Sequence, residues 1–496
     1  MKTLIRNCLI SVSNKEKLEL LANYLNSRKV NIIASGGTSE KIKSFGIQVK
    51  EVSDLTRFPE ILNGRVKTLH PHIYANILSK RNKSDLNDML NNEVDVQYID
   101  LVIVDLYPFS KAIKNAEDES LAIENIDIGG VSLLRAAAKN SKHVCVVSDI
   151  SQYESLINEI EKNDGYVSKS FREECAFLSF KKTSEYDSLI SEWFVRNKKL
   201  RYGENPHQEA IFLGDLEEIF NKIQGKELSY NNLLDVDAAV NLISEFTEPT
   251  IAIFKHTNPC GVSSGKENEP IEDIWDRALS GDPVSAFGGI IIANKEVSEG
   301  FASKLTNMFY EILIAPSYSQ EALIELRKSP KRIILQQINS VKKAPQRKTV
   351  LGGILKQNYD DILIKDKPVV KTIKKPTQDQ VDDLNFANKI VKHTKSNAIV
   401  LVKNKVLLSS GMGQSSRIDA LEQAVLKADK FENSLENSVM ASDAFFPFSD
   451  CIQRAHEEGI VSVIQPGGSI RDKESIELCD KLNISMVMTD TRHFKH

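Results

Sequence analysis

The sequence has few of the features that mark secreted or membrane-spanning proteins. Only six cysteines occur among 496 residues, at positions 8, 145, 175, 260, 451 and 479, and no two lie close together. Scattered cysteines favour a reducing compartment over a disulfide framework. No apolar run approaches the roughly 18 residues of a membrane-spanning helix, so we expect none.

The sequence also lacks a large excess of positive or negative side chains. The 64 Lys and Arg residues and 68 Asp and Glu residues give a net charge of −4. No overall basic field invites nucleic acid or an anionic membrane, so cations that bind an anionic ligand must be placed locally. The N-terminal residues lack the apolar run of a secretory signal, and their acidic follow-on argues against a transit peptide. We therefore expect a cytoplasmic protein without nucleic-acid or membrane partners.

The length predicts two or three domains. Over the first 150 residues, apolar runs at 8–12, 31–35, 101–107 and 144–148 alternate with helical patterns. This alternation is typical of a parallel sheet covered on both faces. A helical stretch over 151–198 follows, and we place the main boundary near 195–200.

Beyond that boundary, the predicted strands lie at 251–254, 288–293, 397–402, 461–464 and 484–488. The lysine-rich region 325–350 shows no clear periodicity and is expected to be a surface connection. No internal repeat of fixed period is visible.

Three polar loops follow strands in the N-terminal half. Residues 11–15 (SVSNK) and 35–38 (SGGT) each open a helix. Small residues at a helix N-terminus leave backbone N–H groups free for an anion. The third loop, 64–71 (GRVKTLHP), contains Arg65, Lys67 and Thr68, which suit a phosphorylated ligand.

Further along, Tyr107 follows the most apolar strand, while Asp127 and Lys139 bracket a glycine turn and a helix. With Lys67, these groups could donate and accept protons on a neutral heterocycle. In the C-terminal half, Lys255 and His256 stand where the apolar run 251–254 ends. Chemistry in open α/β sheets gathers in the crevice at the carboxyl ends of strands, and histidine titrates near neutrality.

These motifs resemble a known family. SVSNKE, ASGGT, GRVKTLHP, LYPF, IDIGG and LLRAAAKN are similar, in order, to an IMP cyclohydrolase domain. LRYGENPHQ, KHTNPCG, SAFGGI, SNAIVLV, GMGQSSRIDA, MASDAFFPFSD, IQPGGSIRD and TRHF are similar to an AICAR transformylase. The sequence thus resembles the bifunctional enzymes of de novo purine biosynthesis from residue 8 to residue 494.

The resemblance implies an α/β fold with a methylglyoxal-synthase-like parallel-sheet domain at 1–197. A larger transformylase region of two cytidine-deaminase-like subdomains would occupy 198–496. The implied reactions are formyl transfer from the cosubstrate 10-formyltetrahydrofolate to AICAR, and closure of formyl-AICAR to IMP with loss of water. The family forms homodimers. Whether a structural potassium ion is bound stays open, and we expect no other metal and no zinc.

The resemblance also implies roles for individual residues. For formyl transfer, His256 would be the base or proton shuttle, Lys255 the oxyanion stabiliser, and Asn258 the group that orients the turn. For ring closure the set is Lys67, Tyr107, Asp127 and Lys139, with Lys139 as proton relay and Asp127 holding the carboxamide. Substrate would be bound in the first domain by Ser11, Ser13, Lys15, Ser35, Gly36, Gly37, Thr38, Arg65, Thr68, Ile128 and Gly129. In the second region, substrate would be bound by Arg201, Tyr202, His207, Gly288, Glu311, Asn397 and Arg417. The folate would be bound by Asp450, Gln465, Pro466 and Arg492.

Two alternatives were weighed against this reading. A zinc deaminase is suggested by His456-Glu457-Glu458, which matches H-x-E, and by Pro259-Cys260, but their order is reversed and residue 263 is serine rather than the second thiolate. An N-terminal module that only binds a phosphorylated effector would use the same SGGT loop and cations. In that case Lys139 and Tyr107 would be dispensable for the function of the module.

Overall fold

The computed structural model describes residues 2–110, 113, 119–195 and 199–496. The chain divides into two compact units, Met1–Asn197 and Lys198–His496. In the described part of the chain, no helix is both long enough and apolar enough to cross a bilayer.

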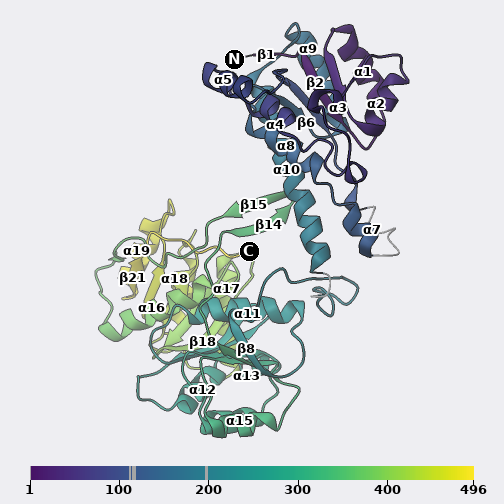
Figure 1. Ribbon diagram of the computed structural model, residues 1–496. Coiled ribbons are helices and arrows are strands. Elements are labelled where there is room, and N and C mark those ends of the chain that lie inside the picture. The colour runs from purple at the N-terminus through teal and green to yellow at the C-terminus, as the bar shows by residue number, and fades with distance from the viewer. Residues whose placement is uncertain (1, 111–112, 114–118, 196–198) are drawn as a thin grey trace. The chain divides into compact units, whose positions relative to one another are not determined.

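The N-terminal unit is built on a five-stranded sheet (Figure 1). In spatial order its strands are β4 (Lys50–Glu51), β3 (Asn31–Ala34), β2 (Asn7–Ser11), β5 (Leu101–Val104) and β6 (Cys145–Val147), all parallel. Strands β2, β3, β5 and β6 lie at the predicted apolar runs, which confirms the parallel sheet. Their side chains form one buried core, because a sheet covered on both faces needs apolar residues at every position.

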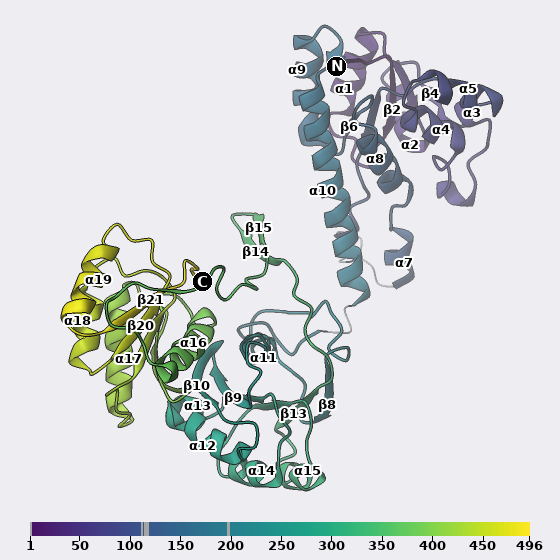
Figure 2. The same ribbon diagram turned by 90° about the vertical axis from the view of Figure 1, so that its left-hand side faces the viewer.

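Helices cover both faces of this sheet. They are α1 (Leu18–Ser27), α2 (Gly36–Lys43), α3 (Val52–Thr56), α4 (Pro71–Leu78), α5 (Lys83–Asn91), α7 (Glu119–Glu124), α8 (Gly129–Lys139), α9 (Tyr153–Lys162) and α10 (Lys169–Phe194). Two short strands, β1 (Thr3–Leu4) and β7 (Tyr166–Val167), pair antiparallel. The long helix α10 packs against α8 and β6, as Figure 2 shows.

The C-terminal unit contains a twelve-stranded sheet formed by two halves with the same plan. The first half has the order β8 (Phe220–Gln224), β13 (Ile333–Gln337), β12 (Ile312–Ala315), β11 (Ile290–Ala293), β9 (Thr250–Lys255) and β10 (Asn258–Ser264). The second has β16 (Val369–Val370), β21 (Ser485–Met488), β20 (Ser462–Gln465), β19 (Val439–Ser442), β17 (Ile399–Lys403) and β18 (Val406–Gly411). Strands β10 and β18 join the halves through the antiparallel pair Ser263 and Val406.

The helices repeat in the same way. The first half contains α11 (Tyr230–Ile243), α12 (Ile271–Ser280), α13 (Pro283–Ala286), α14 (Glu299–Thr306) and α15 (Gln320–Arg327). The second contains α16 (Gln378–Lys392), α17 (Arg417–Lys430), α18 (Asp450–Glu457) and α19 (Asp472–Lys481). The sequence showed no repeat because packing conserves the plan of a duplicated unit without requiring the same residues at matching positions.

One expectation for this unit needs correction. Region 325–350 is not only a surface connection, since it contains β13, whose Ile333, Ile334 and Leu335 are buried. The remainder of that region enters an exposed hairpin, β14 (Gln346–Val350) and β15 (Gly353–Gln357), which stands away from the large sheet in Figure 2. The predicted strand at 251–254 is β9, which pairs antiparallel with both β10 and β11.

Candidate functional sites

A cavity of about 700 Å³ lies in the N-terminal unit at the carboxyl ends of β2, β3 and β5. Chain order reverses here, because β3 lies on one side of β2 and β5 on the other. Open parallel sheets bind ligands at such a switch point. The predicted residues that line this cavity are Ser11, Ser13, Lys15, Ser35, Gly37, Thr38, Arg65, Lys67, Thr68, Tyr107, Asp127, Ile128 and Gly129.

One side of the cavity is suited to a phosphate group. Helix α2 begins here at Gly36, so its first backbone N–H groups have no partner within the helix. The buried hydroxyl of Ser35 has no hydrogen-bond partner among the described residues. Lys15 Nζ donates to Thr38 Oγ1 at 2.9 Å. Burial lowers the pKa of Lys15, an effect that Asp105 opposes and Lys67 reinforces.

Gly36 itself does not line the cavity but contacts a residue that does. Its φ is +50°, and a Cβ there would lie 3.3 Å from Lys67 Nζ. The glycine therefore lets the backbone of α2 approach the ammonium group closely.

The other side of the cavity holds the carboxylate of Asp127. Its Oδ1 accepts the N–H of Gly130 at 2.7 Å, and its Oδ2 accepts that of Tyr107 at 3.4 Å. The Asp127 N–H donates to the Tyr186 hydroxyl at 2.8 Å. Burial raises the pKa of Asp127, while the two amides and the Lys67 cation oppose this shift. The carboxylate is thus held in one orientation at the start of α8.

Two residues differ from what the motifs indicated. Lys139 is the last residue of α8 and does not line the cavity; at 1.5 Å per residue it lies about 15 Å from Gly129 along the helix. Asp105 was not singled out, although it lines the cavity directly after β5 and accepts the N–H groups of Ser13 and Asn14. A carboxylate at the end of so apolar a strand was a signal that could have been found.

In the C-terminal unit, Lys255 and His256 lie at the tight turn between β9 and β10. Lys255 pairs with Asn258, which leaves His256 and Thr257 as the two turn residues. Lys255 Nζ donates to the carbonyl oxygens of Phe287 at 3.2 Å and Gly288 at 2.8 Å. An ammonium group has three donors, so these two bonds fix its position and leave one proton for a ligand.

Gly288 explains why this approach is possible. Its φ is +68°, and a Cβ there would lie 3.1 Å from Lys255 Nζ. Any larger residue would therefore push the ammonium away from its carbonyl partner.

The second half contributes a buried arginine network at the same edge of the sheet. Arg417 is only 6% exposed and donates to Asn397 Oδ1 at 2.8 Å and to the Asp443 carboxylate. Asp443 is fully buried, and its Oδ2 has no hydrogen-bond partner among the described residues. Arg417 therefore orients Asn397 rather than standing free in solvent.

Asn258 connects the two halves. Its Nδ2 donates to the His256 carbonyl at 2.9 Å, and its Oδ1 accepts the N–H of Lys395 at 3.0 Å. The Lys395 carbonyl in turn accepts the N–H of Gly413 at 2.9 Å. One amide side chain thus joins the Lys255–Thr257 turn to the segment that contains Asn397.

The remaining predicted substrate residues lie in the first half. Arg201 stacks on Tyr202 at 5.2 Å, in the loop that also contains His207. The Glu204 carbonyl of this loop accepts a hydrogen bond from Asn231 of α11 at 3.1 Å. Glu311 precedes β12 and forms an ion pair with Lys226 at 2.7 Å.

The four predicted folate residues occupy the second half. Gln465 ends β20 and is fully buried, with its Oε1 accepting the N–H of Gly467 at 2.9 Å. The Pro466 carbonyl accepts the N–H of Asp490 at 3.0 Å, which brings the chain to the exposed Arg492. Asp450 is the first residue of α18 and thus lies in a separate segment from the other three.

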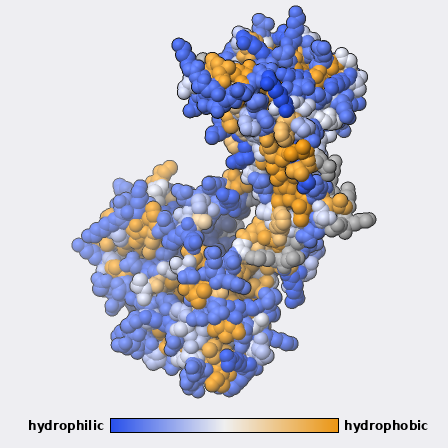
Figure 3. Space-filling model, in the orientation of Figure 1, coloured by the Kyte–Doolittle hydropathy of each residue, from blue (hydrophilic) through white to orange (hydrophobic). Residues whose placement is uncertain are grey.

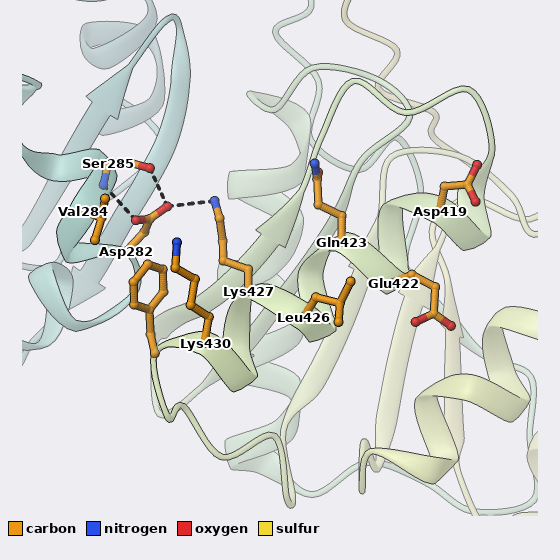
Figure 4. Close-up of a pocket in the computed structure, with 10 residues that line it drawn as sticks. Asp282, Val284, Ser285, Asp419, Glu422, Gln423, Leu426, Lys427 and Lys430 are labelled. Atoms are coloured by element: carbon orange, nitrogen blue, oxygen red, sulfur yellow. Dashed lines mark hydrogen bonds and ion pairs between the residues drawn. The ribbon is translucent and has the colours of Figure 1, made fainter.

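A second cavity, of about 470 Å³, lies between α13 and α17, and none of the predicted residues lines it. Figure 4 shows Lys427 reaching from α17 to Asp282, with Nζ and Oδ2 2.9 Å apart. Asp282 also caps α13 by accepting the N–H of Ser285 at 2.8 Å. Since α13 leads directly into Phe287, this ion pair supports the carbonyl groups that hold Lys255.

In the described part of the chain, no group of three His, Cys, Asp or Glu side chains could hold a metal ion. Fold and sites together define a two-unit α/β protein with one set of clustered polar side chains in each unit. That is the arrangement of a bifunctional enzyme.

Comparison with known proteins identifies the family. A family model described as AICARFT/IMPCHase bienzyme matches residues 137–427, and one described as MGS-like domain matches residues 17–132. The bifunctional purine biosynthesis protein PurH of Bacteroides thetaiotaomicron is 45% identical over 507 residues, covering 99% of both chains. Those of Acetivibrio thermocellus and Persephonella marina are each 43% identical and cover 99% of this chain and all of their own.

The chain therefore belongs to the AICARFT/IMPCHase bienzyme family. It is a bifunctional enzyme of purine biosynthesis, with formyltransferase and cyclohydrolase activity. The crystal structure of ForH is 31% identical and covers 38% of this chain and 99% of its own. Its TM-score of 0.35 is too low to support an argument about the fold.

Proposed function

We propose that the N-terminal unit closes formyl-AICAR to IMP and that the C-terminal unit transfers the formyl group from 10-formyltetrahydrofolate to AICAR. The observation on which this division depends is the position of the two sets of side chains. The phosphate-suited cavity with Asp127 lies wholly in the first unit, and the turn with Lys255 and His256 lies wholly in the second.

Formyl transfer requires a general base and a group that stabilises an oxyanion. The 5-amino group of AICAR is a poor nucleophile, because its lone pair is conjugated through the ring into the carboxamide. A base must take its proton as the nitrogen attacks the formyl carbon, and we assign this role to His256. An oxyanion then forms on the formyl group, and we assign its stabilisation to Lys255, whose ammonium is already fixed by the Phe287 and Gly288 carbonyls. A fixed charge stabilises such an oxyanion without reorganising during the reaction.

Ring closure requires less catalytic assistance from side chains than formyl transfer does. The carboxamide nitrogen and the formyl carbon belong to one molecule, and well-oriented intramolecular reactions reach effective concentrations of about 10⁵–10⁸ M. General acid–base groups add a smaller factor of about 10²–10⁴. Orientation is therefore the larger effect, and the fixed carboxylate of Asp127 is placed to hold the carboxamide. The Lys15 ammonium group and the start of α2 would hold the phosphate.

We assign proton transfer in this cavity to Lys67 and Tyr107, which line it. The role of Lys139 as a proton relay stays a prediction, since the lysine stands at the far end of α8. Ring closure by a Lys139→Ala variant tests that role directly, and normal turnover of formyl-AICAR would remove Lys139 from the mechanism.

The test of the division uses two substrates and one variant. With AICAR and 10-formyltetrahydrofolate, the full chain should release tetrahydrofolate and IMP; with formyl-AICAR alone, it should release IMP. His256→Ala should abolish the first reaction and preserve the second. His456→Ala, which removes an exposed histidine of α18, is the matched control. Loss of both reactions in a folded His256→Ala protein would contradict the division.

We further propose that the enzyme is a cytoplasmic homodimer. Support for the compartment comes from its six cysteines, which are all free thiols. Support for an interface comes from apolar side chains gathered over α10 (Figure 3), where Phe177, Phe180 and Phe194 are exposed. Exposed apolar patches commonly mark interaction surfaces. Sedimentation equilibrium tests this state, and a monomer at micromolar concentration would refute it.

The folate cosubstrate and a structural potassium ion complete the proposal. We assign the folate to the region of Gln465, Pro466 and Arg492, and support comes from the main-chain bonds that join their two segments. Potassium is coordinated mainly by carbonyl oxygens, and we assign no particular carbonyl oxygen of this chain to the ion. Equal activity and stability in potassium chloride and sodium chloride would count against the ion.

A further inference from the structure

The turn that presents His256 has an unusual backbone conformation. Both of its residues are left-handed, with φ of 50° at His256 and 63° at Thr257. Two-residue hairpin turns of this kind normally use Asn-Gly or Asp-Gly, because φ is positive at both positions. A β-branched residue such as Thr257 rarely adopts positive φ. The chain therefore holds this turn against its local preference, and such strain persists only where the surroundings enforce it.

The carboxylate of Asp235 is the group that enforces it. Asp235 lies on α11, and its Oδ1 accepts the N–H of Thr257 at 2.6 Å. Burial raises the pKa of Asp235, and the backbone N–H groups of Thr257 and His256 oppose this shift. Successive N–H groups from left-handed residues converge in this way on a single anion. The cation of Lys255 lies close enough to act on Asp235 as well.

The helix that bears Asp235 is itself firmly placed. Its start is capped by the reciprocal bonds of Ser229 and Asn232. Val236, Ala239 and Val240 are buried, and the helix packs on β9 and β11. A carboxylate on so rigid an element can fix a turn that the turn residues alone would not maintain.

We propose that Asp235 is a positioning residue for formyl transfer. Its carboxylate holds the left-handed turn in the one conformation that keeps Lys255 on the Phe287 and Gly288 carbonyls and presents His256 beside it. Asp235 does not touch the substrate. The inference rests on the proposed role of His256.

Three variants test it in the full-length protein. Asp235→Ala should lower kcat for formyl transfer by about 10-fold to 100-fold, because no carboxylate then offsets the backbone strain of the turn at His256 and Thr257. The KM for AICAR should change less than kcat, since the binding residues lie elsewhere. Asp235→Asn keeps an oxygen that accepts the turn N–H and should lose less than Asp235→Ala.

The decisive test is a rescue. Glycine adopts positive φ without penalty, so Thr257→Gly should restore most of the kcat that Asp235→Ala loses. A residue that merely stabilised the fold would show no such rescue. Asp237→Ala, on the same helix two residues later, is the matched control and should leave kcat unchanged. Ring closure, measured on each sample, reports whether the N-terminal unit is intact.

Each outcome decides the question. Full formyl transfer in Asp235→Ala would overturn the inference, and so would a loss that Thr257→Gly fails to reduce in a folded protein. If Asp235→Ala does not fold, the same comparison is made with Asp235→Asn alone and with Thr257→Gly added. Retained formyl transfer in His256→Ala would refute the proposed function instead, whatever the Asp235 variants do.

Discussion

A buried ionic group in the C-terminal unit predicts how acid destabilises it. His393 caps the end of α16 and is 5% exposed, with its Nε2 3.2 Å from Glu245 Oε1. The same oxygen accepts a hydrogen bond from Lys392 Nζ at 2.8 Å. Burial lowers the pKa of His393 from 6.5 to about 4, although the bond to Glu245 opposes that shift. His393 is therefore neutral in the folded protein at pH 7.

The sign and size of the effect follow from linkage. Between pH 6.5 and 4, the unfolded chain binds a proton at His393 and the folded chain does not, so stability falls as pH falls. From pH 7 to pH 5 the loss is about 2 kcal/mol. Burial raises the pKa of Glu245, but its bonds to His393 and Lys392 outweigh this and lower it to about 2. Its contribution is therefore lost below about pH 4.5, and His393 dominates above that value.

The assay uses the distribution of tryptophan. The chain has two, and Trp275 is buried in the C-terminal unit while Trp193 lies in the N-terminal one. In a Trp193→Phe background, urea unfolding followed by fluorescence reports the C-terminal unit alone.

His393→Gln keeps an N–H donor for Glu245 but does not titrate. It should remove most of the difference in stability between pH 7 and pH 5. An equal pH dependence with and without the histidine would refute the reasoning.

Three further predictions follow from close contacts. Gly411→Ala should destabilise the C-terminal unit by about 3 kcal/mol in the same urea assay, because its Cβ would lie 1.7 Å from the Ala420 carbonyl oxygen; Gly353→Ala, whose Cβ would make an ordinary 3.5 Å contact, should have little effect. Lys255→Ala should lower kcat for formyl transfer by about 10²–10³, the usual cost of losing an oxyanion donor, with ring closure unchanged; comparable loss in both reactions would be evidence against its assigned role. Lys67→Met should weaken IMP binding and slow ring closure without affecting formyl transfer. Isothermal titration measures the IMP affinity and the formyl-AICAR assay measures ring closure. Unchanged IMP affinity would exclude Lys67 from the site.

The sequence predicted the elements with strong local signals. Apolar runs such as 101–107 indicated buried strands correctly, because a strand buried on both faces needs nothing but its own composition to be recognised. The loops after β2 and β3 both line the cavity, because parallel strands bring their carboxyl ends to one edge of the sheet. The motifs that resemble the family, in order along the chain, indicated its membership, which the comparisons confirmed.

Tertiary structure decided which distant residues meet. β9 pairs antiparallel with β10 and β11 and leads into a tight turn, and strand direction cannot be read from an apolar run. Asp235 and Thr257 are 22 residues apart and meet only because α11 packs on β9. The length of α8 likewise leaves Gly129 at the cavity and Lys139 at the other end of the helix. Composition and periodicity indicate whether a segment forms a helix or a strand, because secondary structure depends largely on residues near one another in the sequence. Contacts between distant residues depend on how whole helices and strands pack, and no local sequence pattern records that packing.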